Sequence, residues 1–261
     1  MIKEICANFS KYKYLLCQLI VRDFKVKYKR SVLGIFWSIL YPLLTMSILA
    51  IVFTNFFRFS MPGVNFLVYL MSGLIIFNFV SEATNLAMSS IIANFSLLSK
   101  VYIPKYIFPL SKVLFCGINF LLTLIPFYII VFATGTGTNI YHLLLPFMFI
   151  CVLIFAIGLG LILSTLAVFF RDMLYIYGVV TTLWMYLTPI IYPISIVPEN
   201  IQPVLKMNPL YIFIRFGRQI ILHNTVPSLQ HWIACFGISV FFLIFGLILF
   251  KKQQEKFIYY G

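Results

Sequence analysis

Long uncharged apolar runs make up most of the chain and are separated by short polar segments. A helix needs about 20 apolar residues to cross the hydrocarbon core of a membrane. Six runs predict membrane-spanning helices, at about residues 33–57, 66–92, 110–133, 143–170, 175–194 and 232–250. The third and fourth are divided by the turn-rich run 134–139, which predicts a loop.

Basic residues gather at alternating ends of these runs. With the N-terminus inside, fifteen of the nineteen Lys and Arg side chains lie on the cytoplasmic side, as the positive-inside rule favours. An even number of spans also returns the C-terminus to the cytoplasm. The N-terminus is too polar for a secretory signal, so we expect the first span to stay in the mature protein.

Composition supports an all-α integral membrane protein with one domain over residues 1–261. Hydrophobic residues make up 62% of the chain and charged ones only 10%, too few to cover a soluble globule, which needs about 25%. The net charge of +13 does not indicate a nucleic-acid partner, because the charges lie at the edges of apolar runs. The five cysteines form no CxxC pair and predict no metal site.

Catalytic motifs are missing from the sequence. There is no GxxxxGK[ST] phosphate loop, so we expect no ATP bound in that way, and therefore no cofactor on this chain. No pair of acids suits glycosyl transfer or hydrolysis. We expect no catalytic residues.

The N-terminal segment, residues 1–32, alternates bulky apolar side chains with basic ones. Leu16 and Leu19 recur at helical spacing, and Arg22, Lys25 and Lys29 lie elsewhere around the helix. This pattern predicts an amphipathic helix along the cytoplasmic leaflet, held by apolar burial and anionic lipid headgroups. A plain cluster of topogenic charges is the alternative.

The cytoplasmic loop at residues 93–109 is unusually apolar. Leu97, Leu98, Val101 and Tyr102 together form a patch that suggests a surface for a partner. Packing against the membrane face explains the pattern about equally well.

Glu82 is the only ionisable residue deep in a predicted span. Its spacing from Asn78 and Asn85 places three polar groups on one helix face. A membrane-embedded acid is a functional candidate, so Glu82 is expected to face a protein interior or a water path. A structural hydrogen bond between helices is the alternative.

The fifth span ends in a proline-rich break, and prolines interrupt helices. Such breaks at membrane depth are tolerated where the backbone faces protein or a cavity. We expect some of Tyr41, Tyr69, Tyr186 and Tyr192 to face a substrate, although interfacial aromatic belts give a similar pattern. Between spans five and six, residues 195–231 predict short interfacial or re-entrant helices.

Several motifs, in this order and separation, resemble the ABC-2 type permeases, in the branch that exports O-antigen, capsule and teichoic acid polymers. They run from Leu19 to Trp37 with Tyr41-Pro42, from Lys100 to Lys105 with Phe108-Pro109, and then through Phe170-Arg171-Asp172, Thr188-Pro189, Tyr192-Pro193 and Asn208-Pro209. Together they cover nearly the whole chain.

The resemblance implies partners and sites beyond those the residues predict alone. It implies a homodimer in the bacterial cytoplasmic (inner) membrane and a separate ATPase, with ATP and Mg on that partner. The coupling loop would include Asn94, Leu97, Leu98, Val101, Tyr102 and Pro104. Spans one and five would line a channel for a lipid-linked glycan, and Asn208 and Pro209 would belong to an outer gate region at residues 195–231.

Three other functions remain open from the sequence. The same fold also exports small drugs or antibiotics. A membrane enzyme of glycan assembly would need acidic or basic residues in a large outer loop, and this chain has few. A membrane scaffold would not stimulate a partner ATPase.

Overall fold

A computed structural model describes residues 2–29, 31–52, 64–98, 100 and 103–257, and the side chains from residue 12 onward within them. Within these ranges every regular element is a helix. The expected all-α class is therefore confirmed. The elements are α1 (Ile2–Lys27), η1 (Gly34–Phe36), α2 (Trp37–Ile51), α3 (Phe66–Ala93), α4 (Phe95–Leu98), α5 (Ile107–Ala133), η3 (Ile140–Leu144), α6 (Leu145–Phe169), α7 (Met173–Leu187), η4 (Ile194–Ile196), α8 (Gln202–Lys206), α9 (Pro209–Ile221), α10 (Leu229–Gln253) and η5 (Gln254–Lys256).

Five helical segments of the described chain are long and apolar enough to cross a membrane. They are Gly34–Ile51, Phe66–Ala93, Ile107–Ala133, Ile140–Phe169 and Leu229–Lys256. The fifth expected span, at 175–194, is helical only in α7, whose 15 residues reach about 22 Å against a core of about 30 Å. The helix ends there because Thr188 precedes Pro189, which forces an extended backbone (φ −96°, ψ 130°).

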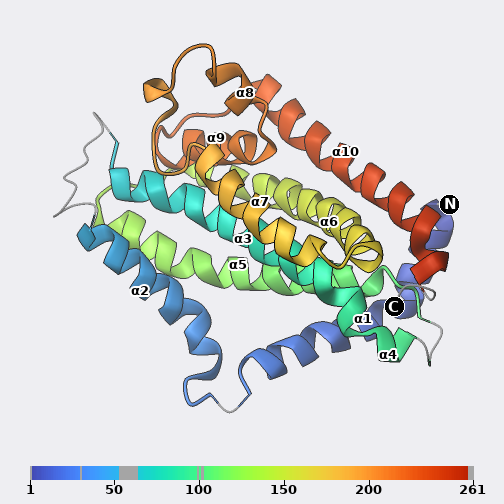
Figure 1. Cartoon of the computed structure of the whole chain (residues 1–261). Helices are drawn as coiled ribbons and strands as arrows, with labels where there is room; N and C mark the ends of the chain where they lie inside the picture. Colours follow the sequence, from blue (N-terminus) through green and yellow to red (C-terminus); the bar gives the residue numbers. More distant parts are fainter. Residues whose placement is uncertain (1, 30, 53–63, 99, 101–102, 258–261) are drawn as a thin grey trace.

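The bundle is organised around α3, which packs between α5 and α6 (Figure 1). Helix α10 lies along the far side of α6, and their glycines allow a very close crossing: a Cβ on Gly158 would lie 2.4 Å from the carbonyl carbon of Phe242. The predicted short helices after the fifth span are present as α8 and α9, and α9 packs against α3, α6 and α10. The irregular residues 188–193 between α7 and η4 are called the α7 break below.

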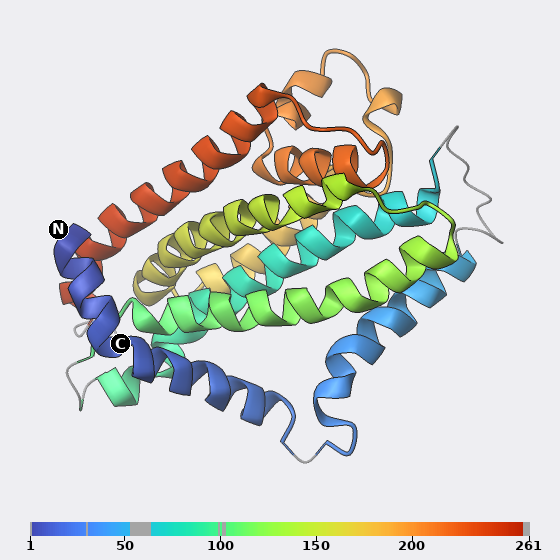
Figure 2. The same ribbon diagram turned by 180° about the vertical axis from the view of Figure 1, so that it is seen from behind.

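Both ends of the described chain lie at one end of the bundle. Helix α1 begins and α10 ends near the short helix α4, whereas α8 and α9 lie at the opposite end (Figures 1 and 2). Helix α1 packs against α5 and then leads through η1 into α2. We call these two regions the α4 end and the α9 end.

Candidate functional site

At the α4 end, the chain turns from α3 into α5 through residues 94–104, which we call the elbow. Asn94 ends α3, and its carbonyl oxygen accepts the amides of Leu97 and Leu98 at 3.0 and 3.1 Å, forming the single turn of α4. Its side-chain nitrogen donates to the carbonyl of Ser90 at 2.7 Å. Asn94 thus fixes the direction in which the chain leaves the long helix.

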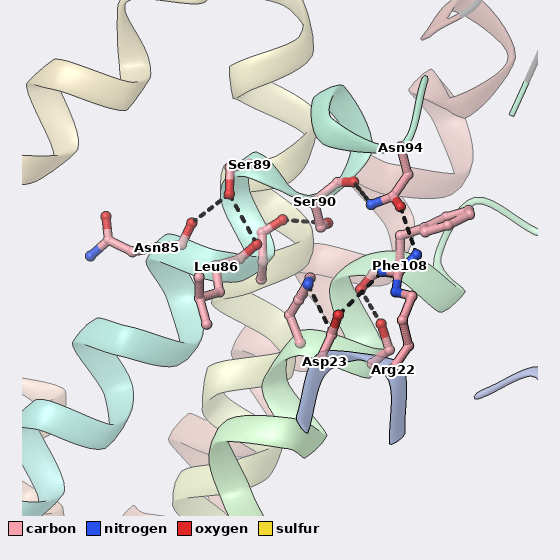
Figure 3. A network of polar contacts seen from close by, with 11 residues as sticks. Arg22, Asp23, Asn85, Leu86, Ser89, Ser90, Asn94 and Phe108 are labelled. Atoms are coloured by element: carbon pink, nitrogen blue, oxygen red, sulfur yellow. Dashed lines mark hydrogen bonds and ion pairs between the residues drawn. The ribbon is translucent and has the colours of Figure 1, made fainter. Parts of the chain in front are cut away.

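A chain of polar contacts connects α1 to the elbow (Figure 3). Arg22 donates to the side-chain oxygen of Asn94 at 3.3 Å and to Asp23 at 3.2 Å. The other carboxylate oxygen of Asp23 lies 2.8 Å from the ammonium of Lys112 on α5. Because Asp23 is only 8% exposed, this pair firmly joins α1 to the start of α5.

The elbow also has an apolar side and an open side. Leu98 packs on a buried cluster made by Leu16, Leu19, Ile107 and Phe108, and so joins α4 to α1 and α5. Leu97, on the same turn, is 36% exposed. Of the other expected coupling residues, Pro104 opens the turn into α5, where its carbonyl accepts the amide of Ile107 at 3.1 Å. Val101 and Tyr102 lie outside the described residues.

The end of α10 is tied to the same region. The ammonium of Lys105 donates to the carbonyl of Gln254 at 2.5 Å and lies 5.6 Å from the ring centre of Phe257. Burial lowers the pKa of Lys105, and the nearby charge of Glu255 partly offsets this shift. The elbow is therefore supported from three sides, by α1, α5 and the end of α10.

The expected basic face of the N-terminal helix lies on the surface. Lys25 and Lys29 are exposed, and with Arg22 they line a shallow groove along α1. The opposite face holds Leu16 and Leu19 against α5. The helix is thus amphipathic in three dimensions, with its basic side open.

Glu82 pairs with the N-terminal helix, since its carboxylate lies 3.4 Å from the ammonium of Lys27, with side chains 47% and 39% exposed. From Phe66 to Glu82, α3 covers about 25 Å, close to the thickness of the hydrocarbon core. Glu82 thus lies in the half of α3 nearer the α4 end, where it meets α1. Asn78 is exposed and Asn85 partly exposed, so the expected polar face of α3 is open within the protomer.

The four candidate tyrosines differ in exposure. Tyr41 on α2 and Tyr186 on α7 are 66% and 63% exposed, so both point away from the protomer. Tyr69 is buried and donates to the carbonyl of Tyr192 at 3.0 Å. Tyr192 is partly exposed and donates to the carbonyl of Tyr186 at 2.8 Å. Two of the four side chains, Tyr41 and Tyr186, are thus exposed on the protomer, whereas Tyr69 holds the α7 break to α3.

Asn208 connects α9 to the α7 break at the α9 end. Its side-chain oxygen caps α9 by accepting the amide of Leu210 at 3.0 Å, and also accepts the indole N–H of Trp184 at 2.9 Å. Its nitrogen donates to the hydroxyl of Thr188 at 2.8 Å. Pro209 is the first residue of α9, a position that suits its fixed φ and missing N–H. The expected outer gate residues therefore lie where α7 and α9 meet.

Arg218 is a residue of this region that sequence reasoning missed. It lies within the region 195–231, for which the sequence predicts interfacial or re-entrant helices, yet it is 6% exposed and donates to three backbone carbonyls of α3 and the α7 break. The sequence gives little sign of this role, because α9 contains two cations, Arg215 and Arg218, in an otherwise mostly apolar run.

Among the described residues, no cluster of three or more His, Cys, Asp or Glu side chains has the geometry to hold a metal ion. Asp23, which connects α1 to the elbow through Arg22, is engaged in ion pairs with Arg22 and Lys112. The arrangement at both ends is suited to mechanical linkage between helices.

Comparison with known proteins gives a consistent result over the whole chain. The family profile described as "ABC-2 type transporter" matches residues 14–222. An O-antigen export system permease protein, RfbA, of Klebsiella pneumoniae is 34% identical over 94% of this chain and 95% of its own length. The RfbA protein of Myxococcus xanthus is 29% identical over 97% and 98%, and the polysialic acid transport protein KpsM of Escherichia coli is 23% identical over 95% and 97%.

Proposed function

This chain belongs to the ABC-2 type transporter family, and on that premise we propose that it is the membrane permease of an ATP-driven exporter of lipid-linked polysaccharide. Its relatives in three organisms are named as permeases or transport proteins for O-antigen and polysialic acid. The two RfbA proteins match at least 94% of this chain and at least 95% of their own lengths. Glycan export is therefore the function that the similarity supports best.

The energy source in this proposal is a separate cytoplasmic ATPase, with ATP and Mg bound on that partner. The elbow is the surface we assign to it, so the α4 end faces the cytoplasm. The observation that carries this assignment is the different packing of two neighbours on α4. Leu98 packs against α1 and α5, whereas Leu97 is exposed and can insert into a pocket of the ATPase. A push on Leu97 would reach α3 and α5 directly, because both helices meet at this turn.

The path for the glycan in this proposal lies between two copies of the chain in the cytoplasmic membrane. Helix α2 is the least buried of the five long apolar segments, and α7 is widely exposed along one side. The open face of α3, with Asn78 and Glu82, adds polar groups for sugar hydroxyls. Tyr41 and Tyr186, on α2 and α7, offer rings that stack on sugar faces.

The basic groove of α1 fits the lipid end of the substrate and the membrane surface. Arg22, Lys25 and Lys29 present cations beside the entrance to α2, where anionic lipid headgroups lie. We assign this groove to membrane lipid and to the phosphate of a lipid-linked glycan.

The test is Leu97→Asp, made in the chain expressed together with its ATPase. A buried charge at the contact is expected to abolish co-purification of the ATPase and ATP-driven export, because a desolvated unpaired carboxylate is strongly unfavourable. Membrane insertion and the thermal unfolding midpoint should stay close to wild type, since Leu97 packs little within the protomer.

Leu174→Asp is the matched control, because Leu174 at the start of α7 is also 36% exposed but lies outside the elbow. It is expected to retain the ATPase. Normal ATPase binding and export by Leu97→Asp would contradict the assignment of the elbow. Identifying the glycan retained by the complex when ATP hydrolysis is blocked then tests the substrate separately.

A further inference from the structure

The α9 end contains a buried cation whose hydrogen bonds go to the backbone. Arg218 donates to the carbonyl of Pro189 at 2.7 Å, to that of Ile190 at 2.9 Å and to that of Tyr69 at 3.1 Å. Its guanidinium also lies 3.5 Å from the ring centre of Tyr69, which is a close cation–π contact. One side chain of α9 therefore joins both the α7 break and the long helix α3.

The surroundings are shaped to admit this side chain. Gly73 lies on α3 one turn after Tyr69, and a Cβ at Gly73 would be 2.9 Å from a guanidinium nitrogen of Arg218 and 3.1 Å from the side chain of Ile190. Any larger residue at that position would push the guanidinium from its place. The fit between Arg218 and α3 thus depends on the missing side chain of Gly73.

The charge of Arg218 has no carboxylate partner among the described residues, and its Nε has no acceptor there. Burying an unpaired cation is costly, so stability alone does not explain it. The three carbonyls give the reason for its presence. Two belong to buried residues of the α7 break, and buried backbone carbonyls outside regular helices need hydrogen-bond donors from the protein. The fork of donors on a guanidinium reaches several carbonyls at once, which a single ammonium does not.

We propose that Arg218 is a positioning residue that holds the outer gate closed by fixing α9 and the α7 break against α3. The inference rests on the proposed function, because the gate belongs to the export path. The donors share one rigid group, so α9 cannot move away from the break without losing the bonds to Pro189 and Ile190 together. The closed gate is then a distinct conformation, and ATP hydrolysis on the partner must open it by breaking these hydrogen bonds.

The test measures leak through the resting gate. The whole chain is reconstituted in lipid vesicles without ATP, and the efflux of trapped radiolabelled sucrose is followed. Arg218→Gln is expected to raise efflux about tenfold, which corresponds to losing roughly 1.4 kcal/mol of preference for the closed state. Arg218→Lys should restore part of the seal, because it keeps the charge and one donor nitrogen but loses the fork of the guanidinium.

Two further variants distinguish the positioning role of Arg218 from a general effect of losing a positive charge and from a folding defect. Arg215→Gln removes an exposed cation less than one turn away on α9 and should leave efflux at the wild-type level. Gly73→Ala displaces the guanidinium without altering Arg218 and should raise efflux in the same direction as Arg218→Gln, by a smaller factor. If Arg218→Gln fails to insert into the membrane, the efflux of Gly73→Ala still tests the proposal.

The proposal would be overturned if Gly73→Ala, and Arg218→Gln where that variant inserts, showed efflux at the wild-type level. It would also be overturned if efflux rose as much in Arg215→Gln as in Arg218→Gln. Amide hydrogen exchange at residues 190–192 provides a readout that needs no substrate, and it should be faster in Arg218→Gln than in Arg215→Gln. If the wild-type complex exported no glycan while exchange changed as expected, the proposed function would fail and the contact of Arg218 would stand.

Discussion

The two ends of α3 are each held by an arginine, but in different surroundings. At the α4 end, Arg22 is 42% exposed and pairs with Asp23, which in turn binds Lys112. At the α9 end, Arg218 is 6% exposed, and its hydrogen bonds within the described chain go to backbone carbonyls, with the ring of Tyr69 beside it. Water reaches the first arginine and is kept from the second.

This difference fits different mechanical roles. A partly hydrated arginine exchanges partners at little cost, because water replaces each bond it loses. A buried arginine without a counter-ion has no such replacement, so its release is a single costly step. The elbow is therefore suited to bind the proposed ATPase. The α9 end is suited to keep the proposed gate closed until ATP hydrolysis moves the helices.

The largest change in stability is expected from Asp23→Ala, on α1 beside the elbow. Removing one member of a buried ion pair leaves Lys112 unpaired, with an expected loss of about 3 kcal/mol in the free energy of unfolding. The thermal unfolding midpoint in detergent should fall clearly. Asp172→Ala, at an exposed acid of the same end, serves as the control and should change little. An unchanged midpoint for Asp23→Ala would show that the elbow is not held by this pair.

An intermediate effect is expected from Asn208→Ala at the α9 end. The variant loses the cap of α9 and the bonds to Trp184 and Thr188, which together predict a loss of roughly 1–2 kcal/mol in unfolding free energy. Asn208→Ser keeps the capping oxygen and should recover part of the stability. Equal losses in the two variants, measured by thermal unfolding, would mean that the links to α7 contribute nothing.

The smallest effect is expected from Glu82→Gln. Its pair with Lys27 is about half exposed, and such pairs contribute about 0.2–1 kcal/mol, which salt screens further. Unfolding midpoints at low and high salt should differ less in the variant than in wild type. A loss as large as that of Asp23→Ala would instead make Glu82 part of the structural framework.

Most of the fold was predictable because lipid imposes strict demands on sequence. Each crossing helix needs a long apolar run, and each basic cluster marks a boundary, so the third, fourth and sixth spans were expected within a few residues of α5, α6 and α10. The early end of α7 was harder to place. Proline at 189 indicated a break, but the apolar residues after it look the same in a span as in a packed loop.

The candidate sites were predictable only where their contacts are local. Asn208-Pro209 is a helix start that can be read from two neighbouring residues. Arg218 depends on Tyr69 and Gly73, about 150 positions earlier in the chain, and no local pattern announces that contact. The depth of Glu82 in the membrane stays a prediction, and its pair with Lys27 joins two helices far apart in the sequence, which no local pattern indicates.

The proposed function requires that the elbow and the α9 end face opposite sides of the membrane, with the elbow inside. Single cysteines at Leu97 and at Met207, which is 79% exposed on the chain between α8 and α9, test it directly in a variant without the native cysteines. In intact cells, a membrane-impermeant maleimide is expected to label Met207→Cys at once and Leu97→Cys only after the inner membrane is opened. Labelling of Leu97→Cys in intact cells would place the elbow outside, where no ATPase can reach it, and would contradict the account.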